Sequence, residues 1–174
     1  MTNGSLTREP SPDVTKSRRH AAPVLVRRFT VSAPVETVRE LLTDLTRLPE
    51  ISEVGRVKNA TAARIEAGVR WRNRGATLKL PSWDASIATE VTPNHIAWHT
   101  RSLVLGLIPV GADWSQSLES RPAGTLVTAT FERVTMFGIP VAPLIKTPFL
   151  PMLYCARGAM MAGEKKLIRV LSAN

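Results

Sequence analysis

The spacing of apolar residues changes soon after a polar first stretch. Apolar and polar positions roughly alternate over residues 24–32, which predicts a β-strand. Pro34 then suits the first turn of a helix, because proline lacks an N–H that this turn would leave unpaired. Apolar residues follow at helical spacing from Val35 to Leu45 and predict an amphipathic helix of about ten residues. Pro49 ends this pattern.

A period of two dominates residues 51–134 and predicts an antiparallel meander of about six strands. Side chains of a strand point alternately to opposite faces, so Arg70, Arg72 and Arg74 share one face and Trp71 points to the other. Such sheets usually bury one face and expose the other to water. The pattern therefore predicts that the arginines face solvent.

Two further strands are predicted by the same alternation. Residues 82–92 form one strand, on which we expect Trp83, Ile87 and Val91 to share a face. In the next strand His99 directly follows Trp98, so the histidine faces solvent if the tryptophan faces the core.

The last part of the chain returns to helical spacing. Four prolines between positions 140 and 151 prevent a continuous helix before about residue 149. An apolar stripe then runs to about residue 172, formed by Leu153, Ala156, Met160, Leu167 and Leu171. The order strand, helix, meander and long helix predicts an α+β domain.

Four segments carry a resemblance to a known superfamily. They are VSAPVETV at 31–38, LTD at 42–44 with LP at 48–49, EVTPNHIAW at 90–98, and LE at 118–119 with GTLVT at 124–128. In order and spacing, and with the closing helix, residues 24–172 resemble the SRPBCC superfamily. This superfamily is also called START-like, and the likeness is to its polyketide cyclase/dehydrase group.

The resemblance implies a helix-grip fold, in which a curved antiparallel β-sheet of about seven strands wraps around a long C-terminal α-helix. An apolar cavity between sheet and helix would hold a small hydrophobic molecule, such as a lipid, a quinone or a polyketide-like compound. The alternative is a polyketide cyclase or dehydratase acting on a ligand in the same cavity. No residue matches the catalytic roles of that group one by one, so the question of enzyme activity stays open. No cofactor is expected.

Candidate ligand-binding residues lie on the predicted strands and the last helix. The tryptophans can be core residues, walls of the cavity, or both, and an indole N–H can orient a polar ligand atom. The predicted set is Trp71, Trp83, Trp98, Trp114, Gln116, Phe131, Leu153, Ala156 and Met160.

Sequence motifs for catalysis, metal binding and disulfide formation are lacking. The chain contains no G-x-S-x-G, P-loop, H-E-x-x-H or G-x-G-x-x-G motif. His20, His95 and His99 lack the spacing of metal ligands, so no metal is expected. Cys155 is the only cysteine and cannot form a disulfide within the chain.

Two unusually apolar segments, residues 103–110 and 136–145, fall between predicted strands. Connections normally run over the surface, so apolar ones need a reason. They can cover the cavity mouth as a gate, pack as core, or contact lipid or another subunit. A peripheral membrane contact and a dimer are therefore both open.

Composition and charge complete the picture. The 174 residues suit one domain, which we place at residues 23–174, after a polar arm at 1–22 that we expect to be disordered. The net charge of +9 favours anions, but no basic run is interleaved with aromatic residues, so nucleic-acid binding is not expected. The single cysteine and the lack of an apolar export signal predict a cytoplasmic location.

Overall fold

The computed structural model describes residues 25–77, 80–104, 106–140 and 150–173, with side chains described except at 75–83, 104 and 150–154. The predicted arm at 1–22 lies outside the described residues. So does the whole second half of the apolar segment 136–145, residues 141–145.

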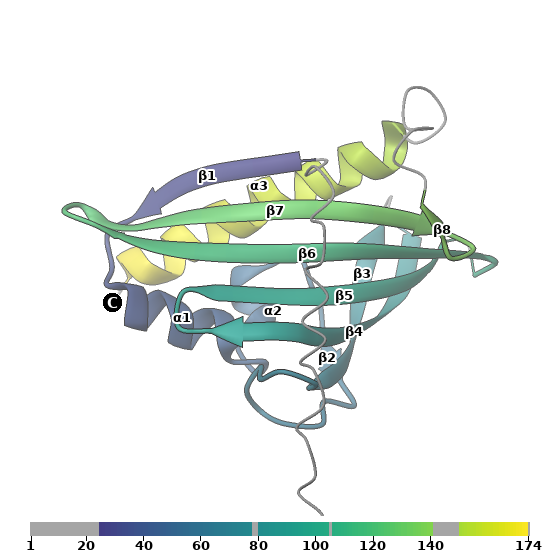
Figure 1. The fold of residues 1–174 in the computed structure, drawn as a ribbon, viewed down its shortest axis with the longest axis horizontal. Coiled ribbons are helices and arrows are strands. Elements are labelled where there is room, and N and C mark those ends of the chain that lie inside the picture. Colours follow the sequence, from purple (N-terminus) through teal and green to yellow (C-terminus); the bar gives the residue numbers. More distant parts are fainter. Residues whose placement is uncertain (1–24, 78–79, 105, 141–149, 174) are drawn as a thin grey trace, which may run out of the picture.

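The order of elements is the predicted one, and Figure 1 shows their arrangement. In chain order they are β1 (Leu25–Val31), α1 (Val35–Thr43), α2 (Leu48–Ile51), β2 (Val57–Lys58), β3 (Arg70–Thr77), β4 (Leu80–Thr92), β5 (His95–Val104), β6 (Ile108–Arg121), β7 (Gly124–Met136), β8 (Ile139–Pro140) and α3 (Leu150–Ser172). All strand pairs are antiparallel, in the order β1-β7-β6-β5-β4-β3-β2, and β8 pairs with β7. This is an α+β helix-grip fold, as expected.

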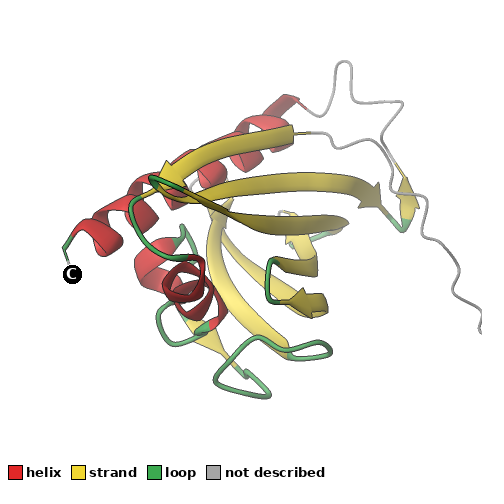
Figure 2. Ribbon diagram, turned by 60° about the vertical axis from the view of Figure 1, so that its left-hand side comes forward, coloured by secondary structure: helices red, strands yellow, loops and turns green. Residues whose placement is uncertain are grey.

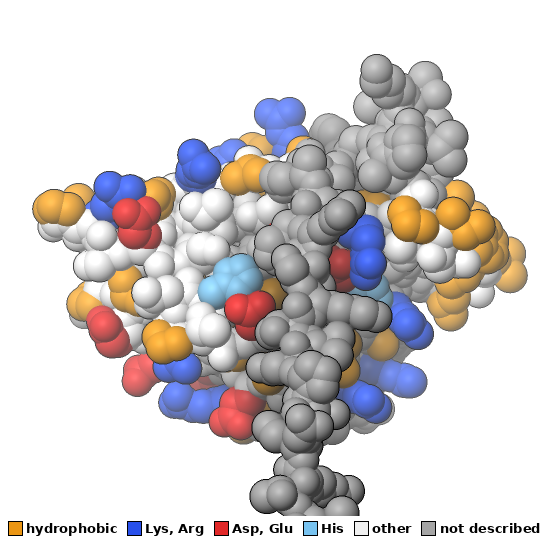
Figure 3. Space-filling view, viewed as in Figure 1, with side chains coloured by type: hydrophobic (Ala, Val, Ile, Leu, Met, Phe, Trp, Pro, Cys, Tyr) orange, Lys and Arg blue, Asp and Glu red, His pale blue; other side chains and the backbone are white. Residues whose placement is uncertain are grey.

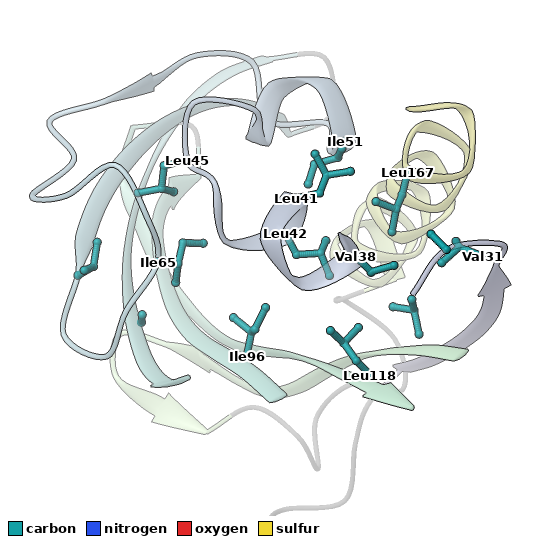
Figure 4. Packing of buried hydrophobic residues seen from close by; sticks show 14 of the residues in the cluster. Val31, Val38, Leu41, Leu42, Leu45, Ile51, Ile65, Ile96, Leu118 and Leu167 are labelled. Atoms are coloured by element: carbon teal, nitrogen blue, oxygen red, sulfur yellow. The ribbon is translucent and has the colours of Figure 1, made fainter. Parts of the chain in front are cut away.

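The sheet is strongly curved, and the three helices lie against its inner side (Figure 2). The main core fills this concave side, as the close view in Figure 4 shows. Val38 and Leu42 of α1 and Leu167 of α3 are buried there. Ile96 and Leu118 cover them from the sheet. The face of the sheet that carries these two residues is the concave face, and the opposite face is the convex face.

The predicted alternation in β3 is confirmed. Trp71 is only 4% exposed and belongs to the core, whereas Arg70, Arg72 and Arg74 are exposed. The arginines therefore lie on the convex face.

Helix α3 is anchored on two opposite sides at residues Glu164 and Lys166. Nε of Arg27 in β1 donates a hydrogen bond to Glu164 and forms an ion pair with it. On the other side, Nζ of Lys166 donates to the carbonyl oxygens of Pro49 and Ser52, at the two ends of α2. Among the described helices, none is long and apolar enough to cross a membrane.

The apolar segments at 103–110 and 136–145 differ from expectation, because their described parts belong mostly to paired strands. Strand β5 continues to Val104 and β6 begins at Ile108, and β7 and β8 form a second hairpin. Gly106 and Gly138 have positive φ angles of 70° and 79°, so two short turns can connect strands that stay paired almost to their ends.

Strand β4 also departs from a strict period of two. Its register against β5 shifts between Ala88 and Glu90. Before the shift Ile87 pairs with His99, and after it Val91 pairs with Ile96. Ile87 and Val91 therefore lie on opposite faces, and the predicted shared face of this strand is wrong. A β-bulge inserts one residue and so inverts the alternation beyond it.

Candidate functional site

Three aromatic side chains form a continuous row on the concave face. Trp98 and Trp114 are cross-strand partners in β5 and β6, and their rings stack with centroids 6.4 Å apart and planes 5° apart. Phe131 of β7 continues the row, with its ring centroid 4.5 Å from that of Trp114 and an interplanar angle of 56°. We call these three residues the aromatic row. Partners in adjacent strands share a face, so the sheet register alone brings them together.

The aromatic row is partly accessible and faces helix α3. Phe131 is buried, but Trp98 and Trp114 are only half-buried. Ala156 and Met160 of α3 belong to the same apolar cluster as Phe131 and Trp114. The structure thus brings together five of the predicted site residues, and two indoles keep part of their surface free.

The remaining predicted site residues are placed less closely. Trp71 is buried in the main core, and half-buried Gln116 is the register partner of Ile96 on the concave face. Trp83 lies opposite Arg74 in the register of β3 and β4. The side chains of Trp83 and Leu153 lie outside the described residues.

A group of polar side chains continues the concave face beyond the aromatic row. Thr100 and Ser102 follow Trp98 on the same face of β5, and each pairs in register with a polar residue of β4. Two residues along a strand span about 6.6 Å, so Thr100 is a direct neighbour of the tryptophan. We call the following five residues the polar cluster: Asn73, Asp84, Ser86, Thr100 and Ser102.

Hydrogen bonds connect the polar cluster across three strands. Ser102 Oγ donates to Asp84 Oδ1 at 2.6 Å, and Asn73 Nδ2 donates to Asp84 Oδ2 at 3.2 Å. The hydroxyls of Ser86 and Thr100 form a further hydrogen bond at 3.0 Å. A carboxyl group is thus held in place by a donor on each oxygen.

Asp84 is the electrostatically unusual member of the polar cluster. Burial raises the pKa of this carboxyl above its ordinary value, and the hydrogen bonds from Ser102 and Asn73 counteract the rise only in part. Burial disfavours the charged form, so this group holds a proton at higher pH than an exposed aspartate. A protonated carboxyl can both donate and accept a hydrogen bond. Asp84 can therefore orient a polar ligand atom or transfer a proton to it.

The sequence patterns did not reveal the polar cluster, for an identifiable reason. Placing Trp83, Ile87 and Val91 on one face put Asp84 and Ser86 on the opposite face, away from the candidate binding residue Trp83. The missed signal was in the next strand, where Thr100 shares the face of Trp98.

His99 lies on the opposite face from Trp98, as predicted, but it does not point freely into solvent. Its Nδ1 lies 2.6 Å from Asp113 Oδ1, and its side chain is 21% exposed. The other oxygen of Asp113 lies 3.2 Å from Nε of Arg133. This convex-face group is separated from the aromatic row by the sheet itself.

A hollow of about 440 Å³ lies beside α3, lined by Arg157, Gly158, Met161, Ala162 and Lys165. None of these residues belongs to the aromatic row or the polar cluster. Among the described residues, no group of three or more His, Cys, Asp or Glu side chains is arranged to hold a metal ion.

Comparisons with known proteins support the fold. No family model matches the chain, and no curated protein is similar to it in sequence. An uncharacterized protein from Rhizobium leguminosarum has a similar structure, with a TM-score of 0.65, 14% identity, and coverage of 86% of this chain and 94% of that one. A conserved protein from Geobacillus kaustophilus gives a TM-score of 0.64 at 16% identity, with coverage of 85% and 94%.

A third similar structure is DynU16, a protein of the dynemicin biosynthetic locus. Its TM-score is 0.58 at 16% identity, and the match covers 85% of this chain but only 46% of DynU16. At such low identities these three likenesses show the fold alone. The class they define is an α+β protein whose curved sheet wraps around a C-terminal helix.

Proposed function

We propose that the protein binds or carries a small hydrophobic molecule, such as a lipid, a quinone or a polyketide-like compound, on the concave face beneath α3. The observation that carries this proposal is the half-buried stack of Trp98 and Trp114 beside the polar cluster. Large aromatic side chains bury much apolar surface when covered, so two stacked indoles that keep part of their surface accessible favour an apolar ligand.

The polar cluster would fix the orientation of that molecule. Apolar binding sites typically contain few polar groups, and these determine which end of the ligand lies where. Asp84 and Ser102 are joined by a hydrogen bond. They are register partners, and Ser102 lies four residues along β5 from Trp98 of the aromatic row. A ligand with an apolar body and one carbonyl or hydroxyl end would match this arrangement.

Binding can be tested with a dansyl-labelled fatty acid as the probe. We expect its emission to rise on binding, and we expect Trp98→Ala to weaken the affinity by about tenfold, because a contact of roughly 1.4 kcal/mol corresponds to that factor. Arg72→Ala is the matched control, because Arg72 is exposed on the other face. Equal affinities for the two variants, or no binding by the parent protein, would contradict the proposal.

Native mass spectrometry of gently purified protein provides a second, independent test. A co-purified apolar compound that is lost in Trp98→Ala would support a carrier. Its mass would also separate lipids from quinones and polyketide-like compounds.

A second candidate, a polyketide cyclase or dehydratase, is favoured by the raised pKa of Asp84. In its protonated form such a carboxyl can protonate a hydroxyl that leaves as water, and the resulting carboxylate can then take up the neighbouring α-proton. DynU16, from a biosynthetic locus, shares the fold. Incubation with a β-hydroxyketone, followed by enone absorbance, tests this activity. Turnover that Asp84→Asn abolishes while probe binding persists would favour the enzyme.

A further inference from the structure

The tips of two adjacent hairpins expose large apolar side chains to solvent. Leu103 and Leu107 at the β5–β6 turn are 52% and 81% exposed, and Phe137 and Ile139 at the β7–β8 turn are 65% and 67% exposed. We call these four residues the apolar tip. Only two other large hydrophobic side chains are exposed among the described residues. Figure 3 shows hydrophobic side chains gathered at the right-hand end, where Figure 1 places β8 and the β5–β6 turn.

The apolar tip is held together by the backbone. Leu103 pairs with Pro109, Met136 pairs with Ile139, and the Phe137 N–H donates to the carbonyl oxygen of Pro109 at 3.0 Å. The two turns are therefore fixed side by side. The backbone that carries the four side chains need not be ordered at the moment of contact, which lowers the entropic cost of binding a partner.

Charged residues near the apolar tip are basic. Residues 101–110 and 133–140 contain Arg101 and Arg133 but no Asp or Glu. Arg133 shares an ion pair with Asp113, whereas Arg101 is exposed. The register runs from exposed Arg72 through Ala85 to Arg101, so these two arginines lie two strands, or about 10 Å, apart.

We propose that the apolar tip docks on the surface of a bilayer that contains anionic lipid. The four side chains would enter the boundary between headgroups and acyl chains, and Arg101 and Arg72 would face lipid phosphates. Exposed apolar patches of this kind mark interaction sites, and basic residues at their edge favour an anionic surface. The apolar tip consists of two paired turns at one end of the sheet (Figure 1), and such an end suits insertion into a fluid surface.

The position of the apolar tip relative to the concave face gives the docking a direction. Ser102 of the polar cluster precedes Leu103, and its register row continues through Val110 to Met136. Docking would therefore bring this end of the concave face to the bilayer. The docking surface itself does not depend on the proposed ligand binding, and it is tested without any ligand.

Co-sedimentation with vesicles tests the docking. We expect the parent protein to pellet with vesicles of phosphatidylcholine and phosphatidylglycerol, and to pellet less at high salt. Leu107→Ser combined with Phe137→Asn should lower the partition coefficient by at least about tenfold. Asn is chosen because Phe137 has a φ angle of 51°, which Asn tolerates well.

Matched variants separate docking from unfolding and from charge alone. Ile168→Ser removes an exposed apolar side chain of α3, away from the hairpins, and should leave partitioning unchanged. Arg101→Gln should weaken binding to anionic vesicles but not the weaker binding to pure phosphatidylcholine. Unchanged melting temperatures would show that all variants remain folded.

Three results would overturn the proposal. The parent protein could stay in the supernatant with anionic vesicles. The Leu107→Ser/Phe137→Asn variant could pellet as the parent does. Sedimentation velocity could also show a parent dimer that this variant dissociates, in which case the apolar tip is a contact between two copies of the chain.

Discussion

The hydroxyl of Ser102 donates a hydrogen bond of 2.6 Å to Asp84 across two neighbouring strands of the concave face. Asn73 donates to the other carboxyl oxygen. Even with these donors, burial raises the pKa of Asp84. The folded protein therefore binds a proton at this carboxyl over a pH range in which the unfolded chain has released it.

This shift predicts how stability responds to pH at one residue. Because the folded pKa lies above the unfolded value of about 4, the native state binds more protons in this window, and stability falls as pH rises through it. Asp84→Asn removes the titration but can still accept the Ser102 hydrogen bond. The melting temperature of the variant minus that of the parent should therefore increase as the pH rises above about 4.

Asp44 offers a control of opposite sign. A hydrogen bond from the Thr46 side chain lowers the pKa of Asp44, so its contribution to stability is present above the unfolded pKa and is lost as pH falls. The melting temperature of Asp44→Asn minus that of the parent should therefore decrease as pH rises. If both variants moved in the same direction, the pKa of Asp84 would be lowered in the folded state and not raised.

The ion pair between Arg27 and Glu164 connects the first strand to the last helix, and it should contribute modestly to stability. Their side chains are 35% and 18% exposed. Because the Arg27 side chain stays partly exposed to water, we expect a coupling energy of only about 0.5–1 kcal/mol, and salt should reduce it. A double-mutant cycle with Arg27→Ala and Glu164→Ala in urea measures it. A coupling of zero at low salt would mean that the two side chains do not interact.

Patterns with one dominant period predicted the fold well. The arginine alternation around Trp71 depends only on the pleat of a strand, and the stripe through Ala156 and Leu167 depends only on the pitch of a helix. The opposite placement of Trp98 and His99 follows from the same pleat. These features are local, so the sequence contains them directly.

The polar cluster and the apolar tip could not be predicted in the same way. The bulge between Ala88 and Glu90 inverts which side chains of β4 point to the concave face, and no residue type in that stretch indicates a bulge. That inversion hid Asp84. At the apolar tip, composition alone left core, cover and contact surface all open. Only the pairing of Leu103 with Pro109 shows that these residues end exposed hairpins.

Two glycines with positive φ angles should respond very differently to alanine. At Gly124, with φ of 126°, a Cβ would lie 2.1 Å from the carbonyl oxygen of Val31. At Gly138, with φ of 79°, an added Cβ would meet no atom of the described residues within 4 Å apart from its own chain neighbours. We expect Gly138→Ala to cost about 1–2 kcal/mol for the backbone alone. Gly124→Ala should cost more than about 3 kcal/mol, because the backbone must also move.

Urea unfolding of both variants measures this difference. Similar free energies of unfolding would mean that the corner between β7 and the residues after β1 relaxes at little cost. That outcome would conflict with the buried hydrogen bond that Thr125 donates to the carbonyl of Ala33 at this corner.

Removal of residues 1–22 should leave the melting temperature nearly unchanged. This stretch offers few apolar groups for burial and contains Pro10 and Pro12. Differential scanning calorimetry of the shortened and full chains measures the effect. A drop of more than about 5 °C, the shift that roughly 1 kcal/mol produces in a small domain, would show that the arm packs on the domain.

The stacked indoles of Trp98 and Trp114 should report ligand binding directly. Both are half-buried, whereas Trp71 is only 4% exposed, so acrylamide should quench the stacked pair in preference to Trp71. In a Trp83→Phe background, saturation with unlabelled fatty acid should shift the emission to shorter wavelength and reduce quenching, because the ligand replaces water against the rings. Trp98→Phe should lose part of this response, because only Trp114 of the stacked pair remains, and Arg72→Ala should keep all of it. A saturating ligand that leaves both emission and quenching unchanged would place the binding site away from the aromatic row.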